Sequence, residues 1–278
     1  MAPPERPGPR SAAFFDLDKT IIARSSTLAF SKAFYAGGLL NRRTLLRSAY
    51  ANLVFGVKGA NHDRLEQMRV QLTSMIAGWD VEAVRRAVRE TLHEIVDPIV
   101  YAEAVDLIEH HRAAGRDVVI VSASGAEVVE PIGELLGVDD VIATTLVESD
   151  GRYTGEVEFY AYGPHKATAM RGIAAERGID LSASFAYSDS ETDVPMLEAV
   201  GHPFCVNPDR ALRSIAAERE WPVLRFERPV GLRRRLGLGA RTGLAAAGVG
   251  AVAGGVVVAL ALRRRRRPPS VWERIRAA

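Results

Sequence analysis

Four short apolar runs constrain the fold of this chain more than any other feature, because polar side chains follow them directly. Such runs are typical of parallel strands that are buried on both faces of a sheet. Segments with helical periodicity separate them, and several of these end in glycine. The alternation predicts an α/β fold, a Rossmann-like parallel sheet with helices on both faces. The runs are residues 12–15, 117–122, 183–188 and 203–206, with 141–144 and 222–226 as further candidates.

Residues 25–97 interrupt this alternation, because they carry no strand pattern. They predict an inserted all-helical cap of four helices, with Ser25 or Ser26 and Asp80 among the expected N-caps. Asp150-Gly151 lies between two extended segments and predicts a β-hairpin. We expect residues 1–10 to form a disordered arm without a secretory signal. The expected helices are 26–36, 42–55, 62–76 and 81–96; the expected core is 11–24 with 98–230, and a basic tail covers 231–278.

Acids and a hydroxyl stand at the ends of three predicted strands. Asp16 and Asp18 follow the first, Ser122 ends the second, and Asp189 follows the third, with Asp193 four residues later. In an open parallel sheet, ligands bind beyond the carboxyl ends of the strands. Carboxylates gathered there repel one another unless a cation lies among them, and hard oxygen ligands suit Mg²⁺.

Four stretches in this order resemble the motifs of the haloacid-dehalogenase superfamily of phosphotransferases. They are DLDKT (16–20), VSAS (121–124), Lys166 in GPHK, and SDSETD (188–193). The resemblance extends over residues 11–226. The helical insert is similar to the C1-type cap of the phosphoserine-phosphatase-like branch, subfamily IB.

This resemblance implies a Mg²⁺-dependent phosphomonoester phosphatase that works through an aspartyl-phosphate. Asp16 would be the nucleophile, and Asp18 would protonate the leaving alcohol and then deprotonate water. Lys166 would neutralise charge on the phosphoryl group. Mg²⁺ would be held by Asp16, the backbone carbonyl of Asp18, and Asp189.

The same resemblance assigns supporting roles. Thr20, Ser122 and the backbone at Ala123 would hold the phosphoryl oxygens. Asp193 would orient Lys166 or bind a metal-bound water, and Thr192 stands where relatives often have asparagine. The adjacent His110 and His111 have no metal-ligand spacing, and we interpret both as solvated.

Two observations bear on the substrate. Phosphoserine phosphatases carry an acid five residues after the motif threonine, whereas this chain has Ser25 there, preceded by Arg24. Arg24 would favour an anionic group over an ammonium. We therefore expect the substrate to be a phosphomonoester. The sequence supports the phosphatase reaction better than it supports phosphoserine as the substrate.

Charge is distributed unevenly along the chain. Residues 231–278 hold 11 arginines and one glutamate, a net charge of +10, whereas residues 1–230 hold 25 basic and 33 acidic side chains, a net charge of −8. A mildly acidic body argues against nucleic acid as a partner. Residues 243–262 are uncharged and about long enough to span a bilayer. They predict a C-terminal hydrophobic helix that tethers a cytoplasmic catalytic domain to the inner face of the membrane; a flexible linker is the alternative.

Other functions fit parts of the pattern. A membrane tether would suit a lipid phosphate, such as phosphatidylglycerophosphate or lysophosphatidate. A membrane-tethered protein that binds a phosphorylated ligand without catalysis is a second alternative, but it has no need of Asp18; a phosphotransferase is a third. DKT also begins the signature of P-type pumps, but Ile22 stands where that signature requires a hydroxyl, so a pump is excluded.

Overall fold

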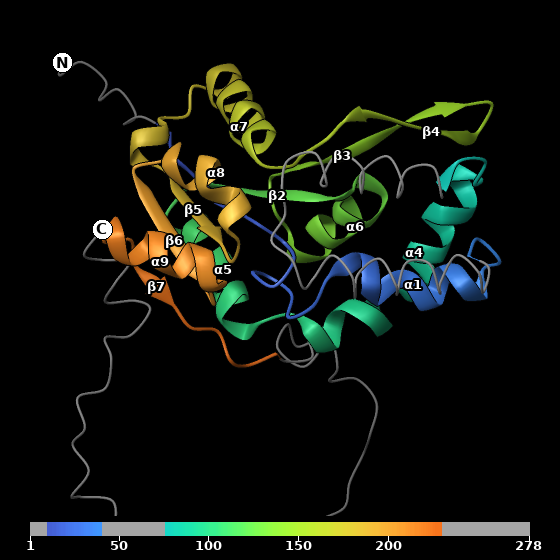
Figure 1. The fold of residues 1–278 in the computed structure, drawn as a ribbon, viewed down its shortest axis with the longest axis horizontal. Helices are drawn as coiled ribbons and strands as arrows, with labels where there is room; N and C mark the ends of the chain where they lie inside the picture. Colours follow the sequence, from blue (N-terminus) through green and yellow to red (C-terminus); the bar gives the residue numbers. More distant parts are fainter. Residues whose placement is uncertain (1–9, 41–75, 230–278) are drawn as a thin grey trace, which may run out of the picture. The chain divides into compact units, whose positions relative to one another are not determined.

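The computed structural model describes residues 10–40 and 76–229, which lie in the first of two compact units, Met1–Leu232. Its centre is a seven-stranded sheet in the order β4-β3-β2-β1-β5-β6-β7 (Figure 1). All neighbouring strands are parallel except β3 and β4, which confirms the mostly parallel α/β sheet. The strands are β1 Ala12–Phe15, β2 Asp117–Gly125, β3 Asp140–Ser149, β4 Arg152–Phe159, β5 Phe185–Ser188, β6 His202–Val206 and β7 Val223–Leu224.

Helices cover both faces of this sheet, as predicted. Phe14 of β1 belongs to a buried cluster with Met170 of α7 and with residues of α8 and α9. The next residue, Phe15, contacts the ring of His111 in α5, because successive side chains of a strand point to opposite faces. The helices are α1 Ser26–Ala36, α4 Val81–Val96, α5 Ala102–Ala113, α6 Ala126–Leu136, α7 Pro164–Arg177, α8 Val194–Glu198 and α9 Arg210–Glu218, with short 3₁₀ turns η1 Asp97–Ile99, η2 Leu181–Ala183 and η3 Glu191–Asp193.

The central strand β1 aligns the three strand ends that matter for function. Phe15 pairs in register with Ile120 of β2 and with Tyr187 of β5. Asp16 follows Phe15 directly, Ser122 lies two residues beyond Ile120, and Asp189 two beyond Tyr187. The parallel register therefore brings these three residues to one edge of the sheet.

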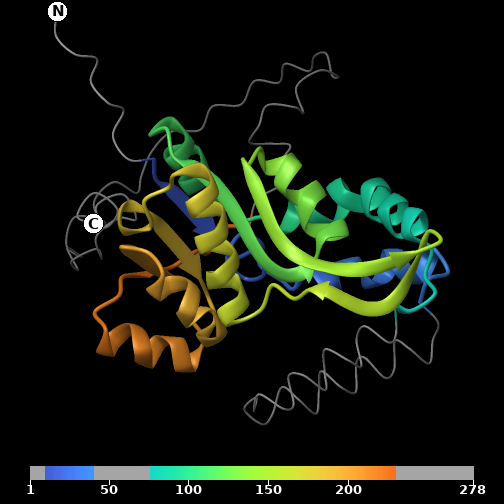
Figure 2. The same ribbon diagram turned by 90° about the horizontal axis from the view of Figure 1, so that it is seen from above.

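The edge next to β3 departs from a fully parallel sheet because β3 and β4 form the predicted hairpin. Asp150 and Gly151 at its tip have φ angles of 51° and 72°. Two consecutive left-handed residues are what a type I′ hairpin turn requires. Figure 2 shows the curved hairpin extending from the sheet toward α1 and α4.

Two of the four helices predicted for the insert have the predicted bounds, α1 and α4. Asp80 caps α4 by accepting a hydrogen bond from the Ala83 backbone N–H. Tyr153 of the hairpin packs with Val81 and Val84 of α4 and with residues of the α1 end, so the described helices of the insert lie on the hairpin. The predicted helix 42–55 and nearly all of 62–76 lie outside the described residues.

The membrane prediction falls on a part of the chain that is not described. Within residues 10–40 and 76–229, no helix is long and apolar enough to cross a bilayer. The predicted span, residues 243–262, lies beyond that range, as do the basic tail around it and nearly all of the predicted N-terminal arm.

Candidate active site

Asp16 is held at the carboxyl end of β1 by the sheet itself. Its backbone N–H donates to the carbonyl of Tyr187 on β5 at 2.9 Å. The chain then turns tightly: the N–H groups of Ile21 and Ile22 both donate to the carbonyl of Leu17. Lys19 takes a left-handed φ of 60° within this turn. The turn places Asp16 and Thr20 in the buried interior and leaves Lys19 exposed.

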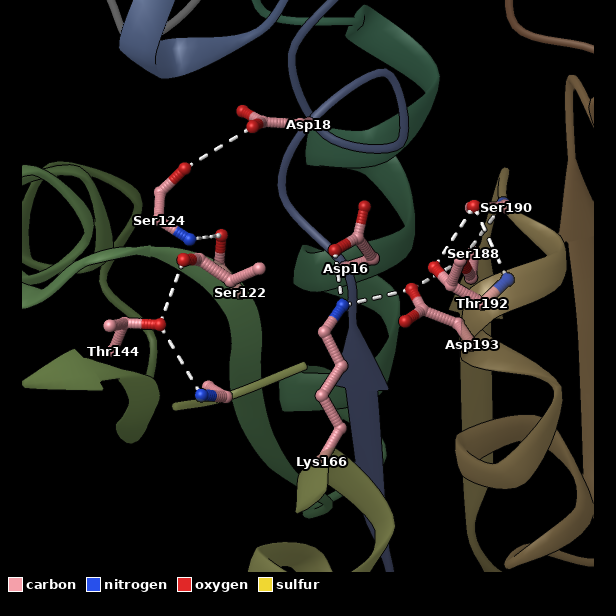
Figure 3. Close-up of polar contacts among 12 residues, drawn as sticks. Asp16, Asp18, Ser122, Ser124, Thr144, Lys166, Ser188, Ser190, Thr192 and Asp193 are labelled. Carbon is pink, nitrogen blue, oxygen red and sulfur yellow. Dashed lines mark hydrogen bonds and ion pairs between the residues drawn. The ribbon is translucent and has the colours of Figure 1, made fainter. Parts of the chain in front are cut away.

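Lys166 joins Asp16 to Asp193 (Figure 3). Its ammonium nitrogen Nζ lies 2.7 Å from Asp16 Oδ1 and 2.9 Å from Asp193 Oδ2. Lys166 stands in the first turn of α7, which begins after Gly163, a residue with a φ of 54°. Ser188, the last residue of β5, donates from Oγ to Asp193 Oδ2 at 2.7 Å. These contacts bring together residues from three of the four sequence motifs.

Carboxyl groups outnumber ammonium groups in this buried group. Burial raises the pKa of Asp16, Lys166 opposes the rise, and Asp193 and Asp189 add to it. Burial also raises the pKa of Asp189, to about 7, with Lys19 opposing. Burial disfavours the ammonium of Lys166, but Asp16 and Asp193 outweigh it and raise its pKa. One permanently charged lysine thus faces three carboxyl groups.

Two buried oxygen atoms of this group have no hydrogen-bond partner within the described structure: Thr20 Oγ1 and Asp193 Oδ1. Leaving a buried polar atom unpaired costs about 1–3 kcal/mol. At a functional site, a bound ligand or water can supply the partner that such atoms lack. Thr20, predicted to hold a phosphoryl oxygen, has a fully buried side chain and stands two residues after Asp18.

The second motif lies where β2 ends. Ser122 is buried, and its Oγ accepts a hydrogen bond from the Ser124 backbone N–H at 3.2 Å. Thr144 of β3 donates from Oγ1 to the carbonyl of Ala123 at 2.8 Å and accepts from the N–H of Ala161 at 3.3 Å. Thr144 therefore ties the second motif to the segment that leads to Lys166. The sequence motifs do not identify it.

Asp18 is oriented by two serines that we did not predict as site residues. The backbone N–H of Ser26 donates to Asp18 Oδ1 at 2.7 Å, and Ser124 Oγ donates to Asp18 Oδ2 at 3.2 Å. Burial raises the pKa of Asp18, and the hydrogen bonds from Ser26 and Ser124 oppose that rise. Ser124 is the last residue of the VSAS motif, so the sequence could have indicated it as a site residue.

Thr192, Lys19 and Arg24 lie at the margin of the group. Thr192 Oγ1 is 3.1 Å from Ser190 Oγ and helps to order the loop before α8. Lys19 Nζ is 4.0 Å from Asp189 Oδ2. Arg24 is exposed, and no hydrogen bond or ion pair joins its guanidinium to the part of the chain that is described. The described structure therefore does not bring the Arg24 guanidinium into contact with Asp16, Asp18 or Lys166.

A magnesium ion fits the donors present. Among the described residues, no group of three or more His, Cys, Asp or Glu side chains has the arrangement of a protein-only metal site. A second buried carboxyl group, Asp189, does lie close enough to Asp16 to contribute to the raised pKa of Asp16. Mg²⁺ commonly takes one or two carboxylates and completes its shell with waters and substrate phosphate. The excess of carboxyl groups over ammonium also suits a cation.

Curated relatives carry the names of phosphatases, among others. The chain is 64% identical over 229 residues to a Streptomyces azureus protein called inhibition of morphological differentiation protein, covering 82% of this chain and 83% of that one. It is 56% identical over 272 residues to a probable phosphatase of Mycobacterium tuberculosis, covering 95% of each. A phosphoserine phosphatase of the same organism is 33% identical over 259 residues, covering 92% and 82%.

Solved structures share the fold. A protein of unknown function from Bordetella pertussis superposes with a TM-score of 0.68 at 30% identity, covering 78% of this chain and 98% of that one. A phospho-aspartyl intermediate analogue of phosphoserine phosphatase gives a TM-score of 0.57 at 21% identity, covering 83% and 99%. At that identity, the second likeness establishes the fold alone.

The family model of haloacid dehalogenase-like hydrolases matches residues 13–198, which span all four motifs. The match covers more than half of the chain, and relatives at 33% identity or more extend over most of it. The chain therefore belongs to the haloacid dehalogenase-like hydrolases and is a phosphatase-type enzyme within that family.

Proposed function

We propose that this protein hydrolyses a small phosphomonoester with Mg²⁺, through an aspartyl-phosphate on Asp16. The observation that carries the proposal is the buried ion pair of Lys166 with Asp16, next to the separately held carboxyl group of Asp18. A nucleophile, a cation for the phosphoryl group and an acid meet at one strand end.

The two aspartates take different roles because their surroundings differ. Lys166 contacts only Oδ1 of Asp16, so Oδ2 is the atom for attack on phosphorus. The bond from phosphorus to the ester oxygen breaks as the bond to Oδ2 forms, and Asp18 gives its proton to the departing oxygen. Asp18 then takes a proton from the water that attacks the aspartyl-phosphate. Its pKa, raised by burial, favours a carboxyl group that holds a proton for the first step.

Asp16, Asp189 and the backbone carbonyl of Asp18 would hold Mg²⁺, which would supply positive charge to the phosphoryl oxygens. Lys166 supplies further charge from the other side. Thr20 Oγ1, buried and without a partner among the described residues, would bind a phosphoryl oxygen together with Ser122 and the backbone at Ala123. Donors fixed before the reaction stabilise developing charge most effectively.

The substrate we propose resembles phosphoserine in size but carries an additional anionic group. A relative named phosphoserine phosphatase supports the size class. Arg24 and Lys19 support the charge, because both are exposed cations on the segment that leads from Asp16 into α1. The predicted cap, residues 25–97, would enclose this part of the substrate.

A second candidate is a lipid phosphate, and it depends on the tail. The uncharged residues 243–262 and their arginine-rich flanks would attract an anionic membrane surface. Sedimentation of the protein with anionic vesicles, with and without residues 231–278, tests this. Equal sedimentation of both forms, with equal activity on lipid phosphates, contradicts it.

Phosphate release from 4-nitrophenyl phosphate by the full-length chain tests the proposal itself. We expect release that requires Mg²⁺, stops with EDTA and is lost in Asp16→Asn. Asp150→Asn, at the hairpin tip, is the matched control and keeps full activity. A folded protein that binds Mg²⁺ but releases no phosphate from this ester or from a panel of small esters would favour the non-catalytic binding protein. Transfer of phosphate to an added alcohol in preference to water would favour the phosphotransferase.

A further inference from the structure

Both oxygens of the Asp18 carboxyl group are engaged, and their partners come from two separate parts of the chain. Oδ1 accepts from the backbone N–H of Ser26, the first residue of α1, at 2.7 Å. Oδ2 accepts from Ser124 Oγ, at the end of β2, at 3.2 Å. The two serine hydroxyls are also 2.7 Å apart. Figure 3 shows Ser124 reaching Asp18 on the side of Asp16 away from Asp193.

The two serine hydroxyls and the Asp18 carboxyl group form one hydrogen-bonded set. A serine hydroxyl has one proton to donate and can accept on its oxygen, so either serine can be the donor between the two hydroxyls. Ser124 Oγ contacts Asp18 Oδ2, and the side chain of Ser26 also forms a hydrogen bond with the Asp18 carboxyl group. Ser26 thus acts on Asp18 twice, through its backbone N–H and through its side chain.

The start of α1 depends on the same contact. The N-cap residue, Ser25, makes no side-chain hydrogen bond to the helix. Helix N-termini leave backbone N–H groups without intrahelical partners, and carboxylates satisfy them well. Asp18 therefore receives one of the free N–H groups of α1. Burial of Ser26, which is fully inaccessible, shields this contact from water.

We propose that Ser124 and Ser26 are positioning residues that aim the Asp18 carboxyl group at the leaving oxygen of the substrate. This inference rests on the proposed function, since Asp18 has a leaving group to protonate only in a phosphatase. Fixing both oxygens stops rotation of the carboxyl group. Without the Ser124 hydroxyl, Oδ2 loses its anchor and Asp18 turns about its contact with the Ser26 N–H.

The choice of leaving group in the substrate distinguishes a positioning role of Ser124 from a purely structural role. An alkyl alcohol needs a proton as it departs, whereas 2,4-dinitrophenolate departs without one. Loss of acid alignment therefore slows cleavage of alkyl phosphates and spares the dinitrophenyl ester. Damage to the fold or to the nucleophile slows both. The parameter to compare is kcat/KM, because it reports the steps up to transfer of the phosphoryl group to Asp16.

The experiment measures kcat/KM of the full-length chain for 2,4-dinitrophenyl phosphate and for its best alkyl phosphate. We expect Ser124→Ala to lose about 10-fold on the alkyl ester and less than about 2-fold on the aryl ester. Ser124→Thr, which keeps the hydroxyl, restores the alkyl rate. In the Asp18→Asn background, Ser124→Ala adds no further loss. Ser31→Ala, on the same helix as Ser26, is the matched control because the Ser31 hydroxyl donates to the Leu28 carbonyl and not to Asp18.

Equal losses on both esters, or no loss on either, overturn the positioning role while leaving the proposed function intact. Additive losses from Ser124→Ala and Asp18→Asn overturn it as well. A wild-type protein that cleaves neither ester overturns the proposed function, and this inference with it.

Discussion

Two groups of polar side chains meet near the end of strand β5, and they differ in their charge and in their hydrogen-bond pairing. The ionic cluster is Asp16, Lys166 and Asp193, with Lys166 coming from α7. The histidine cluster is His111, Tyr187 and Arg116, with His111 coming from α5, on the other face of the sheet. Tyr187 of the histidine cluster and Asp189 beside the ionic cluster are two residues apart.

The histidine cluster is neutral at its centre, and both ring nitrogens of His111 have hydrogen-bond partners. Arg116 can only donate, so His111 Nδ1 accepts from it at 3.2 Å. His111 Nε2 must then carry the proton and donate to Tyr187 Oη at 2.8 Å. Tyr187 also stacks on Phe15, with 4.5 Å between ring centroids. Burial, with Arg116 adding to it, lowers the pKa of His111 to about 3, so the imidazole stays neutral at physiological pH.

The ionic cluster has the opposite properties. It holds an excess of carboxyl groups, and Asp193 Oδ1 has no partner within the described structure. Unpaired buried groups are tolerated where a ligand completes them. The comparison teaches that burial of polar groups is not itself a sign of function. Incomplete pairing and uncompensated charge distinguish the site from its structural neighbour.

Lys166→Met should have the largest effect, and on activity. Removing the ammonium takes away charge that the phosphoryl group needs, so we expect kcat/KM to fall about 10³-fold. Hydrolysis of 4-nitrophenyl phosphate measures it. His111→Gln in the same assay should stay within about 3-fold of wild type, and a comparable loss there would abolish the distinction between the clusters.

His111→Ala should show the reverse pattern. It opens a cavity and leaves the Tyr187 hydroxyl unpaired, so we expect the free energy of unfolding to fall by about 3 kcal/mol. Urea denaturation followed by circular dichroism measures this change. Activity at a temperature where the variant is folded should be retained. A stable variant that has lost activity would assign His111 to the site.

Mg²⁺ should stabilise the protein through the ionic cluster. At a concentration 100 times its Kd, a ligand that binds only the folded state adds about 2.7 kcal/mol. We expect the thermal midpoint to rise with Mg²⁺ and this rise to disappear in Asp189→Asn. An equal rise in that variant would show that Asp189 is not a ligand.

The smallest expected effect is on the pH dependence of stability. The pKa of His111 is about 3 when folded, against 6.5 as the ordinary value, so the unfolded chain binds the extra proton between these values. The stabilisation is complete above pH 6.5 and is lost as pH falls toward 3, by about 1.4 kcal/mol at pH 5.5. Urea denaturation at pH 7.5 and 5.5 measures it for wild type and His111→Gln. Equal pH dependence in both proteins would contradict the buried neutral histidine.

Local sequence signals were enough for much of this fold. Apolar runs predicted β1, and the caps and helical periodicity predicted the bounds of α1 and α4. Asp150-Gly151 predicted the hairpin, because few residue pairs adopt its left-handed turn. Asp16 and Asp193 were predicted together because they follow strands whose ends meet, and Lys166 was added by the resemblance to the family. The structure brings the three side chains into contact.

Contacts between side chains that lie far apart in the sequence could not be predicted in this way. The interpretation of His111 as solvated is wrong, because α5 packs against β1 and β5 and buries that ring completely. Nothing in the neighbouring residues indicates that Tyr187, 76 positions away, accepts its proton. Ser26 and Thr144 were missed for the same reason, since an isolated hydroxyl gains a role only from the segment it contacts in the fold.

The central claim is a covalent phosphate on Asp16, and mass spectrometry tests it most directly. The full-length Asp18→Asn variant would be mixed with Mg²⁺ and 2,4-dinitrophenyl phosphate, quenched in acid and measured intact. This ester transfers its phosphoryl group without a general acid, but hydrolysis of the aspartyl-phosphate then lacks its general base. The intact chain should therefore gain the mass of one phosphoryl group. Digestion of the same sample should place that group on the peptide that contains Asp16. The added Asp16→Asn substitution should abolish the gain. Turnover of this ester by wild type with no adduct in the variant, or an adduct on another residue, would contradict the account.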